Sequence, residues 1–179
     1  SGLQRSDSAV RIHRTSFASA PARTQSTTQS LKTGKKTMAE ISASKARAII
    51  RKAMAKGDEM GFKPLSVVVL DAGGHVKAFE RADGAAPGRF GIAHGKAYGS
   101  VMLGMAGTAQ MARAEQQAYF MAAVNGVYGG QVVPVPGGVL VRDKRGNVIG
   151  AVGVTGDTSD NDVVAAMAGI EAANLIGEA

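Results

Sequence analysis

Apolar and polar residues after residue 65 follow one another in the pattern of two β-hairpins. In each stretch an apolar run, a turn with Asp and Gly, and a second strand-like run succeed one another, as in SVVVLDAGGHVKAFERADGA and VPVPGGVLVRDKRGNVIGAVGVTGD. This order is typical of antiparallel strands joined by a tight turn. We expect strands at 66–70 and about 75–80 in the first hairpin. In the second, we expect a turn at 143–147 and a strand at 148–154.

Helical spacing of apolar residues predicts four helices around these hairpins. The first is capped by Ser42 or Ser44 and ends near Gly57 or Gly61. The others cover 88–107, then 108–124 with Thr108 as its cap, and about 159–176. Two hairpins with helices between and around them predict a single α+β domain, in which helices pack on one side of an antiparallel sheet.

Composition limits the chemistry that the chain can carry. The 179 residues suit one domain with a sizeable core. The chain has no cysteine, which excludes disulfides, thiolate nucleophiles, zinc–thiolate sites and iron–sulfur clusters. It also has no Trp and few aromatic residues, so small and aliphatic side chains are expected to fill the core.

The net charge of +7 is concentrated at the N-terminus. Residues 1–37 hold seven Lys and Arg against one Asp, which leaves 14 basic and 13 acidic residues in the remainder. A nearly neutral domain with few aromatic side chains argues against a nucleic-acid partner.

Residues 1–37 are predicted to be a basic, Ser/Thr-rich extension of a domain that spans 38–179. The extension contains no apolar run of the length that a secretory signal or a membrane span needs, so no membrane partner is expected. We expect a cytoplasmic protein. The alternative is an organellar transit peptide, which the shortage of acidic residues would also suit, and Met38 is a candidate for the biological start.

Glycine recurs every four residues within the second predicted helix, at Gly91, Gly95 and Gly99. Each glycine inside a helix costs about 1 kcal/mol relative to Ala, so another interaction is expected to offset the loss. One explanation is close packing against the sheet or a second subunit. The other is a platform for a flat ligand.

No standard catalytic motif is present. The glycines at 150, 153 and 156 match neither a dinucleotide-binding fingerprint nor a phosphate loop. Asp157, Asp160 and Asp162 lack the glycine and the terminal Glu of a calcium loop. We interpret these carboxylates as stabilising the N-terminus of the last helix.

His94 is the most promising of the three histidines. On a helix it shares one face with Tyr98 and Met102, which follow at i+4 and i+8. Imidazole, phenol and thioether groups together could border an iron-porphyrin or another apolar ligand. A histidine that merely packs at a surface or an interface is the alternative, and His75 is expected to be exposed after its turn.

Three ordered blocks, DAGGHVKAFERADGA, IAHGKAYGSV and PVPGGVLVRDKRGNVIGAVGVTGDTSDND, resemble the GlcG/HbpS-like haem-binding family, which includes the C-terminal domain of PduO-type proteins. The resemblance covers about residues 40–176. It implies a profilin-like α+β domain, with an antiparallel sheet flanked by helices, that assembles into a symmetric homo-oligomer, commonly an octamer. It also implies that the ligand is haem, a related tetrapyrrole or iron.

The resemblance nominates cofactor-binding residues by position. Pro136, Gly137 and Gly138 match the family's second hairpin, where they would serve the ligand or equally a turn or subunit contact. The family often has a residue other than His at 94 and Thr-Ala in place of Gly99-Ser100, and its haem ligand differs between members. The candidates for cofactor binding are therefore these three residues with His94, Tyr98 and Met102, and the candidate metal ligand is His94.

Two other functions remain open. In a cofactor-free enzyme for a small carboxylate or hydroxy acid, Arg81 and Lys96 would bind the anion and Asp83 or Asp157 would act as acid or base. The backbone N–H groups at 137–138 would stabilise an oxyanion. Lys96 should then lie beside a polar pocket with a carboxylate or an anion close by. The third alternative is a structural or partner-binding oligomer.

Overall fold

A computed structural model of the chain describes residues 40–179, so the predictions for the N-terminal extension lie outside the described residues. Within this range five strands form one antiparallel sheet in the order β2-β1-β4-β3-β5. The elements follow in the order α1 (Ala43–Met60), β1 (Ser66–Asp71), β2 (Val76–Arg81), α2 (Arg89–Leu103), α3 (Gly107–Gln116), α4 (Ala118–Val127), β3 (Gly138–Arg142), β4 (Val148–Thr155), α5 (Ser159–Ala172) and β5 (Ile176–Glu178).

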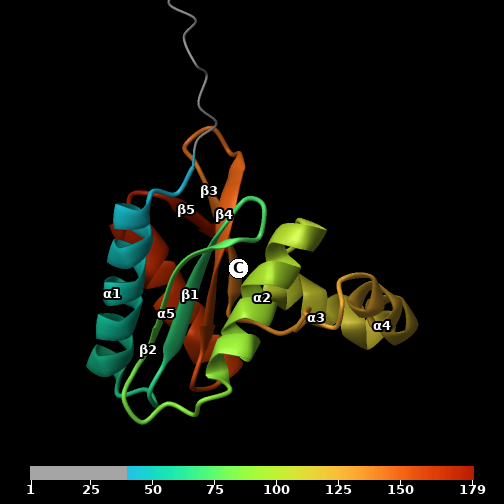
Figure 1. Cartoon of the computed structure of the whole chain (residues 1–179), viewed down its shortest axis with the longest axis horizontal. Coiled ribbons are helices and arrows are strands. Elements are labelled where there is room, and N and C mark those ends of the chain that lie inside the picture. The colour runs from blue at the N-terminus through green and yellow to red at the C-terminus, as the bar shows by residue number, and fades with distance from the viewer. Residues whose placement is uncertain (1–39) are drawn as a thin grey trace, which may run out of the picture. The chain divides into compact units, whose positions relative to one another are not determined.

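Helices cover both faces of the sheet, with α1 and α5 on one face and α2 on the other (Figure 1). The predicted α+β class with a sheet flanked by helices is confirmed, whereas the expectation of helices on one side only was wrong. Val67 and Val69 of β1 face α1 and α5, and Val68 and Leu70 face α2. An uninterrupted apolar strand is typical of a sheet buried on both faces, and β1 carries that signal.

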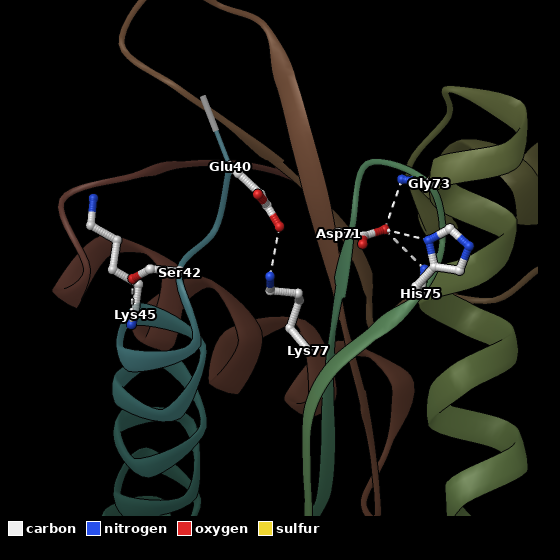
Figure 2. A network of polar contacts seen from close by, with 7 residues as sticks. All are labelled: Glu40, Ser42, Lys45, Asp71, Gly73, His75 and Lys77. Atoms are coloured by element: carbon white, nitrogen blue, oxygen red, sulfur yellow. Dashed lines mark hydrogen bonds and ion pairs between the residues drawn. The ribbon is translucent and has the colours of Figure 1, made fainter. Parts of the chain in front are cut away.

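The predicted hairpins and first helix are present with nearly the predicted bounds. Asp71 closes the first hairpin, because its carboxylate accepts hydrogen bonds from the N–H groups of Gly73 (2.8 Å) and His75 (3.0 Å) and lies 3.2 Å from His75 Nδ1 (Figure 2). Ser42 caps α1 by accepting from the Lys45 N–H at 3.2 Å (Figure 2).

Two other predictions need correction. The helix expected at 108–124 is two helices, because the backbone breaks at Gln117, and position 106 rather than Thr108 precedes the first turn. The last helix ends at Ala172 instead of continuing to 176. Asn174 adopts a left-handed conformation (φ 56°), after which β5 pairs with β3. A partner strand far away in the sequence thus determines the end of this helix.

The backbone of α2 lies directly on the sheet. Gly138 of β3 pairs with Gly153 of β4, and a Cβ atom on either residue would collide with a carbonyl oxygen of α2, that of Lys96 or Ala93. Only glycine allows this approach. Among residues 40–179, no helix is long and apolar enough to cross a membrane.

Candidate ligand-binding site

A row of five rings runs along α2 and onto its neighbours, and we call it the aromatic row. Its ring centroids lie 4.9 Å apart for Phe79 and Phe90, 5.7 Å for Phe90 and His94, 5.3 Å for His94 and Tyr98, and 6.1 Å for Tyr98 and Tyr128. The middle three residues are four apart in sequence and therefore share one helix face. Phe79 comes from β2 and Tyr128 follows α4.

Part of this row faces solvent. Phe90 is 42% exposed and Phe79 is 36% exposed, whereas His94, Tyr98 and Tyr128 are half-buried. The rings therefore form a partly open apolar surface beside the edge strand β2.

His94 lies in the middle of the aromatic row, and its ring stacks on that of Tyr98 with an interplanar angle of 20°. Burial lowers the pKa of His94, because it disfavours the charged imidazolium. Burial therefore favours the neutral imidazole, which is the form that binds a metal.

Met102 lies at one end of the same face, as the helical spacing predicts. A Cβ atom built on Gly74 would lie 2.8 Å from Met102 Cε and 3.1 Å from the Tyr98 ring, so the first hairpin turn packs against both side chains. The Tyr128 hydroxyl donates a hydrogen bond to the Met102 carbonyl oxygen at 3.3 Å. The structure thus brings three of the nominated residues, His94, Tyr98 and Met102, to one surface.

The glycine stripe of α2 is explained by packing at two of its three positions. A Cβ atom on Gly95 would lie 2.5 Å from Val133 Cγ2, and one on Gly99 would lie 2.6 Å from Gln110 Oε1. A Cβ atom on Gly91 would meet no atom within 4 Å. Gly95 and Gly99 therefore face the chain's own segments rather than an open platform.

Lys96 forms a buried ion pair with Asp162. Its Nζ lies 2.7 Å from Asp162 Oδ2, with the two side chains only 3% and 1% exposed. The other carboxylate oxygen of Asp162 accepts the Asp157 N–H at 3.2 Å. Burial raises the pKa of Asp162, and the Lys96 ammonium opposes that effect. A carboxylate does lie next to Lys96, but it belongs to Asp162 and not to Asp83 or Asp157.

Pro136, Gly137 and Gly138 are buried, and Gly137 lies beside this ion pair. Gly137 has a positive φ of 102°, and a Cβ atom there would lie 2.8 Å from Lys96 Nζ. Gly138 lets α2 approach, as described above. The structure gives both glycines a part in packing α2 onto the sheet, and it does not place them in the aromatic row.

Two other catalytic candidates, Arg81 and Asp83, do not join Lys96 in the described part of the chain. The Arg81 guanidinium donates to the carbonyl oxygen of Ala85, and Asp83 is exposed. Among residues 40–179, neither forms an ion pair with Lys96.

Asp157 connects the segment before β1 to the start of α5. It accepts hydrogen bonds from the Lys63 N–H at 2.7 Å, the Thr158 N–H at 2.8 Å and Asn161 Nδ2 at 2.8 Å. These bonds lower the pKa of Asp157 to about 2. Its carboxylate is therefore ionised at neutral pH and engaged in fixing the backbone.

Sequence reasoning missed Phe79, Phe90 and Asp162 as parts of these clusters. Phe90 precedes His94 by four residues, so helical spacing could have found it. Nothing in the sequence connects Phe79 to α2 or Asp162 to Lys96, because each pair is formed by tertiary packing.

The chain forms a helix-flanked antiparallel domain, and the aromatic row gives it a partly open apolar surface. A family model described as "Haem degrading protein HbpS-like" matches residues 41–171. The chain belongs to the HbpS-like family, which confirms the resemblance noted from its sequence blocks.

Solved structures share this fold. A PduOC:heme complex is 22% identical, with a TM-score of 0.69 over 77% of this chain and 98% of that chain. The Klebsiella pneumoniae protein ORFY is 23% identical, with a TM-score of 0.69 over 78% and 95%. A double mutant of Streptomyces reticuli HbpS is 24% identical, with a TM-score of 0.65 over 86% and 97%. No curated protein matches the chain.

Proposed function

We propose that this protein binds haem or a related tetrapyrrole on the aromatic row. The observation that carries the proposal is the half-buried imidazole of His94, set between the rings of Phe90 and Tyr98 on a partly exposed apolar face. Two comparisons support this ligand over other flat apolar molecules. The description of the chain's family names haem, and a protein of the same fold was solved in complex with haem.

The residues present fit such a group. A porphyrin is flat and apolar, so it gains from contact with aromatic faces, and its iron takes an imidazole or a thioether as axial ligand. We propose His94 as the metal ligand, with Tyr98 and Met102 bordering the ring. The bound iron would supply the redox chemistry of the site. Gly137 and Gly138 would contribute indirectly, because they let α2 pack closely on the sheet, and Pro136 precedes them in the same buried segment.

We further propose a homo-oligomer, with the octamer as the expected state. Tyr119 and Val127 of α4 are largely exposed, and only Met121 of that apolar helix is buried. A second copy would cover this surface and remove apolar area from water. Light scattering that reports a monomer at micromolar concentration would refute the assembly.

A haemin titration followed in the Soret region tests the ligand. We expect a shifted Soret band that saturates at a defined stoichiometry, and an altered spectrum in His94→Ala. His75→Ala is the matched control, because His75 lies on an exposed turn with its side chain 81% exposed. If His94→Ala has the wild-type spectrum and affinity, His94 is not the ligand. If wild-type protein leaves the haemin spectrum unchanged, haem binding itself is excluded.

A further inference from the structure

Three polar residues lie side by side across three neighbouring strands. Ser66 of β1 pairs with Arg81 of β2 and with Thr155 of β4. Directly paired residues of antiparallel strands point to the same face of the sheet. Ser66 precedes Val68 by two residues, and Val68 packs on the α2 side. This polar row therefore faces α2.

Arg89, the first residue of α2, reaches the same row. Its Nη1 donates a hydrogen bond to Thr155 Oγ1 at 2.9 Å, and its side chain is half-buried. Within residues 40–179 neither Arg89 nor Arg81 forms an ion pair. The Asp162 carboxylate acts electrostatically with Arg89 but already pairs with Lys96. Two guanidinium groups thus lack an ion-pair partner at this end of α2: that of Arg89, which is half-buried, and that of Arg81, which is exposed and donates to the Ala85 carbonyl oxygen.

Ser66 provides a second, independent observation. Its side chain is fully buried, and its hydroxyl has no hydrogen-bond partner among the described residues. Buried hydroxyls normally have a partner, since leaving one unsatisfied costs about 1–3 kcal/mol. A hydrogen-bond acceptor that reached this hydroxyl would satisfy it, and because Ser66 is fully buried, the surrounding side chains would have to shift to admit one.

We propose that Arg89, Arg81, Ser66 and Thr155 form a binding site for a carboxylate group. The planar guanidinium donors match the two oxygens of a carboxylate. The first turn of α2 contains no acidic residue and has no side-chain cap, so the helix dipole adds to the attraction for an anion. Arg89 also acts electrostatically on Asp162, but it makes no ion pair with that carboxylate, which is bound to Lys96.

The location of the site connects it with the aromatic row, because Arg89 directly precedes Phe90, the first ring of that row on α2. A porphyrin on that row would bring a propionate carboxylate to Arg89, and in this form the inference rests on the proposed function. A free small carboxylate could supply the same group. The two sources differ in whether the carboxylate belongs to a tetrapyrrole, and an experiment can separate them.

The first test compares haemin with haemin dimethyl ester, in which both propionates are blocked. The Arg89→Gln variant should bind haemin about 10- to 100-fold more weakly than the wild type, because it loses a charge-assisted hydrogen bond to a propionate. The ester should bind the wild type and the variant equally. Arg51→Gln is the matched control, because Arg51 is exposed on α1, on the opposite face of the sheet, and its loss removes the same charge.

The second test measures acetate and lactate binding by calorimetry in the same proteins. Binding that Arg89→Gln abolishes and Arg51→Gln keeps supports the site, with a free acid as its occupant. If the wild type binds these acids but not haemin, the carboxylate site stands and the proposed function fails. If haemin binds wild type, Arg89→Gln and Arg51→Gln alike and no acid binds, the proposed function stands and the carboxylate site is refuted.

Ser66→Ala separates a loss of ligand binding from a loss of folding stability. Because the hydroxyl has no partner in the free protein, its removal should leave the unliganded protein at least as stable as the wild type. The same change should weaken binding of the carboxylate ligand by several-fold. A destabilised Ser66→Ala protein with unchanged affinity would remove Ser66 from the site. Arg89→Lys, which keeps the charge but loses the guanidinium fork, should bind more weakly than the wild type and more tightly than Arg89→Gln.

Discussion

Replacing Lys96 by Met would leave the Asp162 carboxylate buried without its partner. Only 1% of the Asp162 side chain is exposed, so water cannot take the place of the ammonium group. Removing one member of a buried ion pair costs about 3–5 kcal/mol, because the remaining charge stays desolvated. In a chain of this size that loss lowers the melting temperature by roughly 6–20 °C.

A second change should restore most of the lost stability. In Lys96→Met/Asp162→Asn no charge remains buried, and the Asn side-chain oxygen can still accept the Asp157 N–H. Replacing both members of a buried pair is often nearly neutral. Lys52→Met is the control for losing a lysine at an exposed position of α1 and should change the unfolding free energy by less than about 0.5 kcal/mol.

The loss of unfolding free energy caused by Lys96→Met should also depend on pH. Burial raises the pKa of Asp162, and Lys96 opposes this, so the pKa rises further when Lys96 is lost. A raised pKa in the folded state means that the folded protein binds the extra proton, so the variant regains stability as pH falls. Urea unfolding at pH 7 and pH 5, at one protein concentration, measures the effect. A deficit below about 1 kcal/mol at pH 7, or one that does not shrink at pH 5, would refute the buried-charge argument.

Two further predictions concern packing and pH. Gly91→Ala should stabilise the protein by about 0.5–1 kcal/mol, because the added Cβ meets open space, whereas Gly95→Ala should destabilise the protein, because its Cβ clashes with Val133. Thermal unfolding of the two variants tests this prediction, and equal changes in their stability would refute it. The pKa of Asp157 is lowered to about 2, so the stability it contributes is present above about pH 4 and is lost as pH falls towards 2. The difference in unfolding free energy between wild type and Asp157→Asn should therefore shrink over that interval, and a constant difference would contradict the assignment.

Local chemistry explains which predictions from the sequence were right. The hairpin turns and the first helix depend on residues close together in the chain, such as Asp71 with Gly73, or Ser42 with Lys45. Helical spacing likewise placed His94, Tyr98 and Met102 on one face. The extension at 1–37 and the cytoplasmic location stay predictions.

The sequence by itself determined the hairpins, most of the helices, the α+β class and the family, because turn residues and hydrophobic periodicity act over a few positions. Only the tertiary structure decided the break at Gln117, the strand β5, and the partners of Lys96 and Arg89. Lys96 and Asp162 are 66 residues apart, as are Arg89 and Thr155. Such pairs form when distant segments pack against one another, and neither residue's neighbours in the chain carry a signal for the other.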